Sequence, residues 1–336
     1  MVDDHKKSRR AVLKYGGVSI VGASLAGCLG RDGGDEYPSQ SIRLVVPFSE
    51  GGSTDTFARQ LQSHLSDELG VEIQIENIPG SASLRGAQEA YNSDPDGYTY
   101  LMMNPPSTPL STVINDTDWD ITEMKGVASY ERTSILVMVN PDLEIQDFED
   151  LLSRYSNGEL SQWAGQTVGS YYHVASLYMR QNYDLSFDDY IGYEGNGPAT
   201  QSVVSGENPA GISSSAATQG FTEDDRLEVP VLLGSAGTPA YPDTPTIPDL
   251  GYEDMDFLGN LTRSFAAPPE TPDENIETFS SAVESVLGND ELQQWGEETG
   301  ANFEYMGPDD TDQLIDEVVN KVQEELDVES IREQIN

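Results

Sequence analysis

The residues with the clearest chemical potential form a short run of small polar residues between a predicted strand and a predicted helix. They are Gly51, Gly52, Ser53, Thr54 and Asp55. Glycines in such a loop let a ligand approach the backbone closely. The helix start offers unpaired N–H donors and the positive end of the helix dipole, which together suit an anion. The alternative is ordinary capping, with Ser53 or Thr54 as the cap and Asp55 in the favourable first turn.

Two other predicted helix starts follow the same logic. The residues concerned are Ser170, Tyr171, Tyr172 and His173 at one start, and Asn196, Gly197, Pro198 and Ala199 at the other. Helix N-termini that face one cleft could hold a carboxylate without any arginine. For His173 the alternative is a core histidine bonded to its own loop, and for the two tyrosines it is packing. Asn104, after a predicted strand, and Ser213 and Ser214, at the end of another, are further candidates to line the cleft.

Patterns that would indicate an enzyme or a metal site are missing from the sequence. It has three histidines and one cysteine, with no metal-ligand spacing among them. It also lacks a Gly-x-Ser-x-Gly elbow and a phosphate-binding loop that ends in Gly-Lys-Ser/Thr. We therefore expect no catalytic residue, no metal and no cofactor. Acidic residues are so abundant that a secreted hydrolase using an Asp/Glu pair stays open as the least favoured alternative.

The elements that must position these loops alternate between strands and helices. The run Ser41–Val46 reads as a buried strand, and Phe57, Leu61 and Leu65 recur at helical spacing until Gly70. A β-α-β-α-β order predicts an α/β protein with a mainly parallel sheet in each of two lobes. The remaining predicted strands cover 71–75, 98–103, 135–139 and 229–233, and the remaining helices 83–91, 148–155, 170–180, 201–204, 275–287, 290–298 and 310–326.

The charge of the chain limits its partners. Against 17 Lys and Arg stand 59 Asp and Glu, which gives a formal net charge of −42. So negative a surface repels phosphate backbones and anionic lipids, so we expect no nucleic-acid partner and no basic membrane patch. The acid is spread along the chain, which favours adaptation to high salt, as in a haloarchaeon-like halophile, because salt screens self-repulsion. The alternative is an acidic secreted protein.

The N-terminal residues look like an export address. Arg9 and Arg10 precede a short apolar run, as in a twin-arginine signal peptide. Leu25-Ala26-Gly27-Cys28 then resembles a lipobox. We predict a signal over 1–27, lipidation of Cys28 and a flexible tether over 28–36, because glycines and acids dominate that stretch. The mature protein would then sit on the extracytoplasmic face of the membrane, held by its lipid alone.

Short motifs in a fixed order resemble the extracytoplasmic substrate-binding proteins of tripartite tricarboxylate transporters. The resemblance runs over nearly all of residues 37–325 and rests on several weak pieces in the right order. These pieces are Tyr37-Pro38 through Pro47-Phe48, Gly51-Gly52 with Asp55, Glu76-Asn77 with Pro79-Gly80, Asp96-Gly97-Tyr98-Thr99, Gly169-Ser170 with His173, Tyr193 with Gly195 to Ala199, Pro242-Asp243 with Pro245-Thr246, and Ala267-Pro268 with Thr271-Pro272.

This resemblance implies a two-lobed fold of the periplasmic-binding type II class, with two crossovers between the lobes. Lobe 1 would hold 37–135 and 262–336, and lobe 2 would hold 136–261. It also implies that a monomer captures a small di- or tricarboxylate, or a related carboxylate, between the lobes and delivers it to the membrane subunits of a tripartite permease. An alternative is a ligand-presenting sensor subunit with no transport role, which would use the same cleft.

Overall fold

The computed structural model describes residues 37–253 and 255–335, and the chain from Tyr37 onward forms one unit. The predicted signal (1–27), Cys28 and the tether (28–36) lie outside the described residues. Within the described part, no helix is both long and apolar enough to cross a membrane. In the same part, no group of three or more His, Cys, Asp or Glu side chains is placed to hold a metal ion.

A nine-stranded mixed sheet forms the frame of this unit, in the order β2-β1-β3-β9-β4-β7-β5-β6, with β8 paired to β4. The strands are β1 Ile42–Val46, β2 Ile73–Asn77, β3 Thr99–Met103, β4 Lys125–Val139, β5 Gln162–Gln166, β6 Asp189–Tyr193, β7 Ala210–Ser214, β8 Glu228–Leu232 and β9 Asn260–Ala267. The pairs β1–β2, β1–β3, β5–β6 and β5–β7 are parallel, as the β-α-β order predicts.

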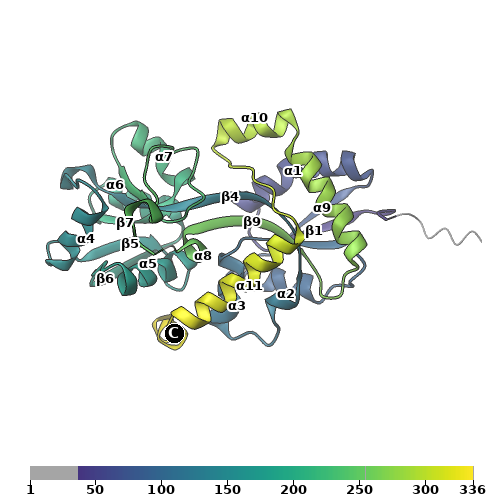
Figure 1. Ribbon diagram of the computed structural model, residues 1–336, viewed down its shortest axis with the longest axis horizontal. Helices are drawn as coiled ribbons and strands as arrows, with labels where there is room; N and C mark the ends of the chain where they lie inside the picture. The colour runs from purple at the N-terminus through teal and green to yellow at the C-terminus, as the bar shows by residue number, and fades with distance from the viewer. Residues whose placement is uncertain (1–36, 254, 336) are drawn as a thin grey trace, which may run out of the picture. The chain divides into compact units, whose positions relative to one another are not determined.

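Two antiparallel strands, β4 and β9, run side by side through the middle of the unit (Figure 1). Residues Lys125–Ser134 of β4 pair with β9, and from Ile135 onward β4 pairs with β7 and β8 instead. The sheet is therefore mixed: β4 and β9 run antiparallel to each other in its middle, whereas the pairs named above are parallel. The predicted lobe boundaries, 135/136 and 261/262, fall inside β4 and β9, and the lobe division itself stays a prediction.

Helices cover the sheet, and several of them begin in loops that follow strand ends. The helices are α1 Ser53–Leu69, α2 Leu84–Tyr91, α3 Ser107–Asn115, α4 Phe148–Ser156, α5 Tyr171–Asn182, α6 Asn196–Val204, α7 Ser215–Glu223, α8 Asp256–Gly259, α9 Asp273–Leu287, α10 Asp290–Thr299, α11 Pro308–Glu325 and α12 Val328–Ile335, with 3₁₀ turns at Ile121–Glu123, Pro141–Leu143 and Pro248–Leu250. As predicted, α1 ends at Gly70, which takes the left-handed conformation (φ 69°).

Apolar side chains form one large core in each half of the sheet. In one half, α1 and α9 pack on β1 and β3, and the rings of Tyr100 and Phe279 stack with centroids 4.1 Å apart. In the other half, α4 and α5 pack on β5, with Trp163 fully buried and its Nε1 donating to Ser176 at 3.0 Å. These cores hold the sheet rigid beneath the loops that carry the polar residues.

Several elements of the structure were not predicted from the sequence, and the predicted bounds of others are shifted. Strand β4 begins ten residues before the predicted 135, and β5, β6, β9, α3, α7 and α12 were not predicted as elements. All eight residues of β9 are buried, so its sequence shows no regular alternation of polar and apolar residues. Its four polar residues, Asn260, Thr262, Arg263 and Ser264, also prevent a continuous apolar run. β2 covers 73–77 where 71–75 was predicted, a shift of two residues that keeps the same side chains on each face.

Candidate ligand-binding site

A cavity of about 1080 Å³ opens where the loops after several strands converge. Its wall includes residues that directly follow β1, β3, β5 and β7, together with the bulge-bearing middle of β4 and of β9. Ligands of open α/β sheets bind outside the carboxyl ends of the strands, so the position fits that rule. In size it lies at the upper end of small-molecule sites, which occupy about 300–1,000 Å³.

Helix starts make up much of the wall. Ser53 and Thr54 open α1, Ser107 opens α3, Asn196 opens α6, and Ser215 opens α7. At all of these starts, no side chain caps the first turn. Helix starts left without a side-chain cap offer backbone N–H donors and the positive end of the dipole to an anion.

Only two charged side chains, Glu131 and Arg263, appear on this wall among the described residues. The chain as a whole carries 59 acidic residues, so the wall excludes nearly all of them. Hydroxyl, amide and backbone groups provide the rest of its polarity. An acidic lining would repel an anion and attract a cation. Because this wall is not acidic, it suits a small anion better than a cation.

Glu131 and Arg263 face each other across β4 and β9 and form a buried ion pair. The guanidinium also donates from Nη2 to Ser53 Oγ at 3.2 Å, and its Cζ lies 4.4 Å from the centre of the Phe57 ring. Burial raises the pKa of the Glu131 carboxyl, and the neighbouring guanidinium partly offsets that rise. The prediction that the site needs no arginine overlooked this residue.

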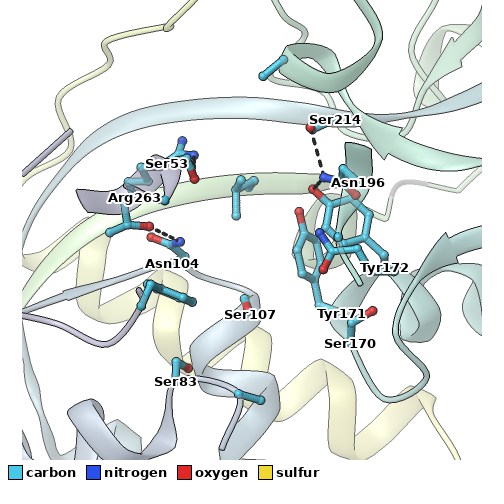
Figure 2. Close-up of a pocket in the computed structure, with 18 of the residues that line it drawn as sticks. Ser53, Ser83, Asn104, Ser107, Ser170, Tyr171, Tyr172, Asn196, Ser214 and Arg263 are labelled. Atoms are coloured by element: carbon cyan, nitrogen blue, oxygen red, sulfur yellow. Dashed lines mark hydrogen bonds between the residues drawn. The ribbon is translucent and has the colours of Figure 1, made fainter. Parts of the chain in front are cut away.

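Two asparagines join hydroxyl groups on opposite sides of the cavity (Figure 2). Asn196 Nδ2 donates to Tyr172 OH at 2.8 Å and to Ser214 Oγ at 3.1 Å, and Asn104 Nδ2 donates to Thr54 Oγ1 at 2.8 Å. The Oδ1 atoms of both asparagines are buried without a partner among the described residues. Because hydroxyls donate or accept equally well, either amide could turn over, keep a bond to its hydroxyl and free its NH₂ for a ligand.

Tyr171 and Tyr172 supply an aromatic side to the wall. Their ring centres are 4.2 Å apart, and both side chains are buried. Burial raises the pKa of both phenols above the usual value of 10, so both keep their protons at neutral pH. A protonated phenol can donate a hydrogen bond to a carboxylate, which an ionised one cannot do.

The structure brings many of the predicted site residues together on one wall. Those that line the cavity are Gly52, Ser53, Thr54, Asn104, Ser170, Tyr171, Tyr172, Asn196 and Ser214. They come from both halves of the sheet, as the predicted cleft between lobes requires. That these residues bind a ligand remains a prediction.

Some predicted residues do not line the cavity. For Asp55 and His173, hydrogen bonds to nearby residues explain why. Asp55 is buried, and its Oδ2 accepts from the Gly51 backbone N–H at 2.8 Å and from Arg59 Nε at 2.9 Å. His173 is buried too, and its Nδ1 accepts from the Gly169 backbone N–H at 3.2 Å. This matches the alternative weighed for His173, a core histidine bonded to its own loop.

The other predicted residues outside the wall are held away by the backbone course. Gly51 turns the loop with φ 76° and is exposed. Gly197 and Pro198 are exposed on α6, and Ala199 is buried beneath it. Ser213 is fully buried and bonds to Thr200 Oγ1 at 2.9 Å, because in a strand it points to the face opposite Ser214.

Sequence reasoning missed several residues of the wall. Polar wall residues outside the predicted set include Ser83, Ser111, Thr133, Gln166, Ser215, Glu131 and Arg263. One signal was available: Arg263 is a single charge among small and apolar residues, and Glu131, next to Arg132, interrupts a similar run on the other strand. A buried charge needs a partner. Their pairing across 132 positions of sequence is not visible without the fold.

Comparison with known proteins identifies the family of this chain. The profile of the TctC family, the tripartite tricarboxylate transporter family receptor, matches residues 57–328. BugT of Bordetella pertussis is 26% identical over 301 residues, which cover 88% of this chain and 90% of BugT.

Solved structures show the same fold. A TctC solute-binding protein from Polaromonas superposes with a TM-score of 0.75 at 20% identity, covering 89% of this chain and 99% of that protein. MatC of Rhodopseudomonas palustris, solved with bound malate, gives a TM-score of 0.66 at 22% identity, covering 88% of this chain and 100% of MatC. A second R. palustris protein, solved with adipate, gives 0.68 at 22% identity, covering 89% and 99%. Because the family profile spans well over half of the sequence, this chain belongs to the TctC family of tripartite tricarboxylate transporter receptors.

Proposed function

We propose that this protein is an extracytoplasmic receptor that captures a small organic acid in the described cavity and delivers it to a tripartite permease. One observation carries the proposal. The wall combines uncapped helix starts, hydroxyls and amides, and among the described residues Glu131 is the one acidic side chain on it, although the chain has 59 acidic residues. The malate and adipate bound by the two R. palustris proteins support a di- or tricarboxylate as the ligand class.

Closure of two lobes around the ligand is part of this proposal. The lobes would be 37–135 with 262–336, and 136–261, joined through β4 and β9. β4 has register shifts between Gly126 and Ala128 and between Ser129 and Glu131, and the second one ends at Glu131 on the cavity wall. Such bulges bend strands locally, which favours a hinge at this place.

Membrane attachment through Cys28 and export by the twin-arginine route complete the proposal. They rest on Arg9-Arg10 and on Leu25-Ala26-Gly27-Cys28. The natural chain should be found in the membrane fraction and should partition into the detergent phase. A C28A variant should either stay with the cells as unprocessed precursor or appear in the medium. Natural chain found free in the medium would contradict the anchor.

A salty habitat is proposed from charge alone. The net charge of −42 fits a protein that works where salt screens its self-repulsion. The relatives named above come from bacteria, so they lend no support to a haloarchaeal source.

The function can be tested by thermal shift and calorimetry of the purified protein in molar KCl. The probes are citrate, succinate, malate and adipate. A ligand at 100 times its Kd should stabilise the fold by about 2.7 kcal/mol, a rise in Tm of about 4 °C for a protein of this size. N196A should lose this rise because it removes the bonds to Tyr172 and Ser214.

The matched control is N157A, at the exposed end of α4 and outside the cavity wall. It should keep the rise in Tm. If no carboxylate shifts a cooperative melt, or if N196A and N157A behave alike, the proposed function is wrong in its ligand or in its site.

A further inference from the structure

We propose that Arg263 binds a carboxylate of the ligand directly, and that Glu131 is a built-in competitor for the same guanidinium. This inference rests on the proposed function and specifies how the cavity recognises its ligand. It would make Arg263 the anchoring residue for one end of the acid. It would also make Glu131 the residue that sets how strongly that anchor attracts anions.

The guanidinium of Arg263 is incompletely satisfied. It has five N–H donors, of which Nη1 bonds to Glu131 and Nη2 donates to Ser53 Oγ at 3.2 Å. Its Nε is buried without a hydrogen-bond partner among the described residues. A buried donor without a partner carries a desolvation cost, which an arriving acceptor removes.

The surroundings limit how a partner can reach this guanidinium. The side chain is 6% exposed, and the Phe57 ring covers its face at 4.4 Å. A polar partner must therefore approach in the plane of the group, along the edge formed by Nε and Nη2. That edge has the geometry to bind a carboxylate by two parallel hydrogen bonds.

The same edge lies beside the uncapped start of α1. Ser53, which accepts from Nη2, is the first residue of that helix, and Figure 2 shows Arg263, Ser53 and Asn104 together on one side of the cavity. A carboxylate that displaced the Ser53 hydroxyl from Nη2 would meet the guanidinium and the helix N–H groups at once. Two independent features thus point to an anion at one place.

Glu131 cancels the charge of Arg263 but bonds only to Nη1, which leaves Nε without a partner among the described residues. Cross-strand register places the two residues opposite each other, and both are buried. At a distance the pair is neutral, so it gives little attraction to anions in general. At contact, only an acid whose carboxylate fits the free edge gains the hydrogen bonds, which favours selection by geometry over selection by charge.

Three variants test the inference, with affinity for malate, succinate and adipate measured by calorimetry in molar KCl. R263K keeps a positive charge but loses the planar edge, and it should weaken binding about tenfold or more, the value of one charged hydrogen bond. E131Q removes the competitor and should tighten binding about threefold or more. E131Q/R263Q removes both charges, so no buried charge is left unpaired, and it should bind at least as weakly as R263K.

The matched control is R43Q/E76Q, which removes a cross-strand ion pair of 2.9 Å outside the cavity wall and should leave affinity unchanged. A merely structural role for Arg263 would not make E131Q bind more tightly. Affinity within twofold of the natural chain in R263K overturns the anchor, and E131Q that binds no more tightly overturns the competitor. If the natural chain binds none of the acids, the proposed function fails instead, so the two failures are distinguishable.

Discussion

His173 and Gly169 close the start of α5 without any ligand. The imidazole Nδ1 accepts a hydrogen bond from the Gly169 backbone N–H at 3.2 Å, and Ser170 Oγ accepts from the His173 backbone N–H at 3.3 Å. The starts of α1, α6 and α7 have no side-chain cap. This difference explains why His173, the most reactive side chain predicted for the site, serves structure, while Ser53 and Asn196 face the cavity.

The first prediction concerns pH. Burial lowers the pKa of His173 to about 4, with repulsion from Arg180 as a second cause, whereas in the unfolded chain it is about 6.5. Protons therefore bind the unfolded state more readily, and the stability that His173 contributes above pH 6.5 is lost as the pH falls toward 4. The expected loss is about 3 kcal/mol, at 1.36 kcal/mol per pKa unit.

H173Q provides the comparison, because glutamine can accept a hydrogen bond but does not titrate. Unfolding free energies of both proteins at pH 7.5 and 4.5 should show a larger fall for the natural chain. Equal falls would mean that His173 is not held neutral by the fold.

The second prediction separates a structural role for Asp55 from a ligand-binding one. D55A removes the acceptor for the Gly51 backbone N–H and for Arg59 Nε, and should lower the unfolding free energy by about 2 kcal/mol, typical of hydrogen bonds to a charged group. D67A, an exposed acid on the same helix, is the control and should change stability little. Chemical denaturation measures both, and similar values for the two variants would contradict the structural role.

The third prediction compares two glycines. A Cβ on Gly211 would lie 2.3 Å from the Ala164 carbonyl oxygen, so G211A should force β5 and β7 apart and cost about 1–3 kcal/mol or more. Gly197 has open space and lies in the first turn of α6, so G197A should be neutral or stabilise by up to about 1 kcal/mol. Thermal melts decide this, and ligand affinity that falls in G197A would restore Gly197 to the site.

The fourth prediction concerns salt. With a net charge of −42, self-repulsion destabilises the fold at low ionic strength. Raising KCl from about 0.1 to 1 M shortens the Debye length from about 10 to 3 Å, so Tm should rise over this range. KCl is the suitable salt because sulfate also strengthens burial of apolar surface. A Tm that stays flat, with equimolar sucrose as the uncharged control, would show that the acidic surface is not tuned to salt.

The sequence by itself determined many of the local elements, and it determined the family. Helical spacing of Phe57, Leu61 and Leu65, with Gly70 as the stop, predicted α1 because periodicity and capping are properties of neighbouring residues. The glycine and serine loops at strand ends likewise predicted which helix starts could face an anion. Short motifs in a fixed order resembled the family to which the profile match assigns the chain.

Only the tertiary structure decided which residues meet across the cavity. β4 and β9 are far apart in sequence, and their register places Glu131 opposite Arg263. No local pattern encodes that register, since it depends on how the whole chain closes through the sheet. The tertiary structure also decided the roles of Asp55 and His173, which the sequence analysis had placed in the binding site because of their residue types. Each bonds to residues close by in the sequence, Asp55 to Gly51 and Arg59 and His173 to Gly169, and each is buried away from the cavity wall.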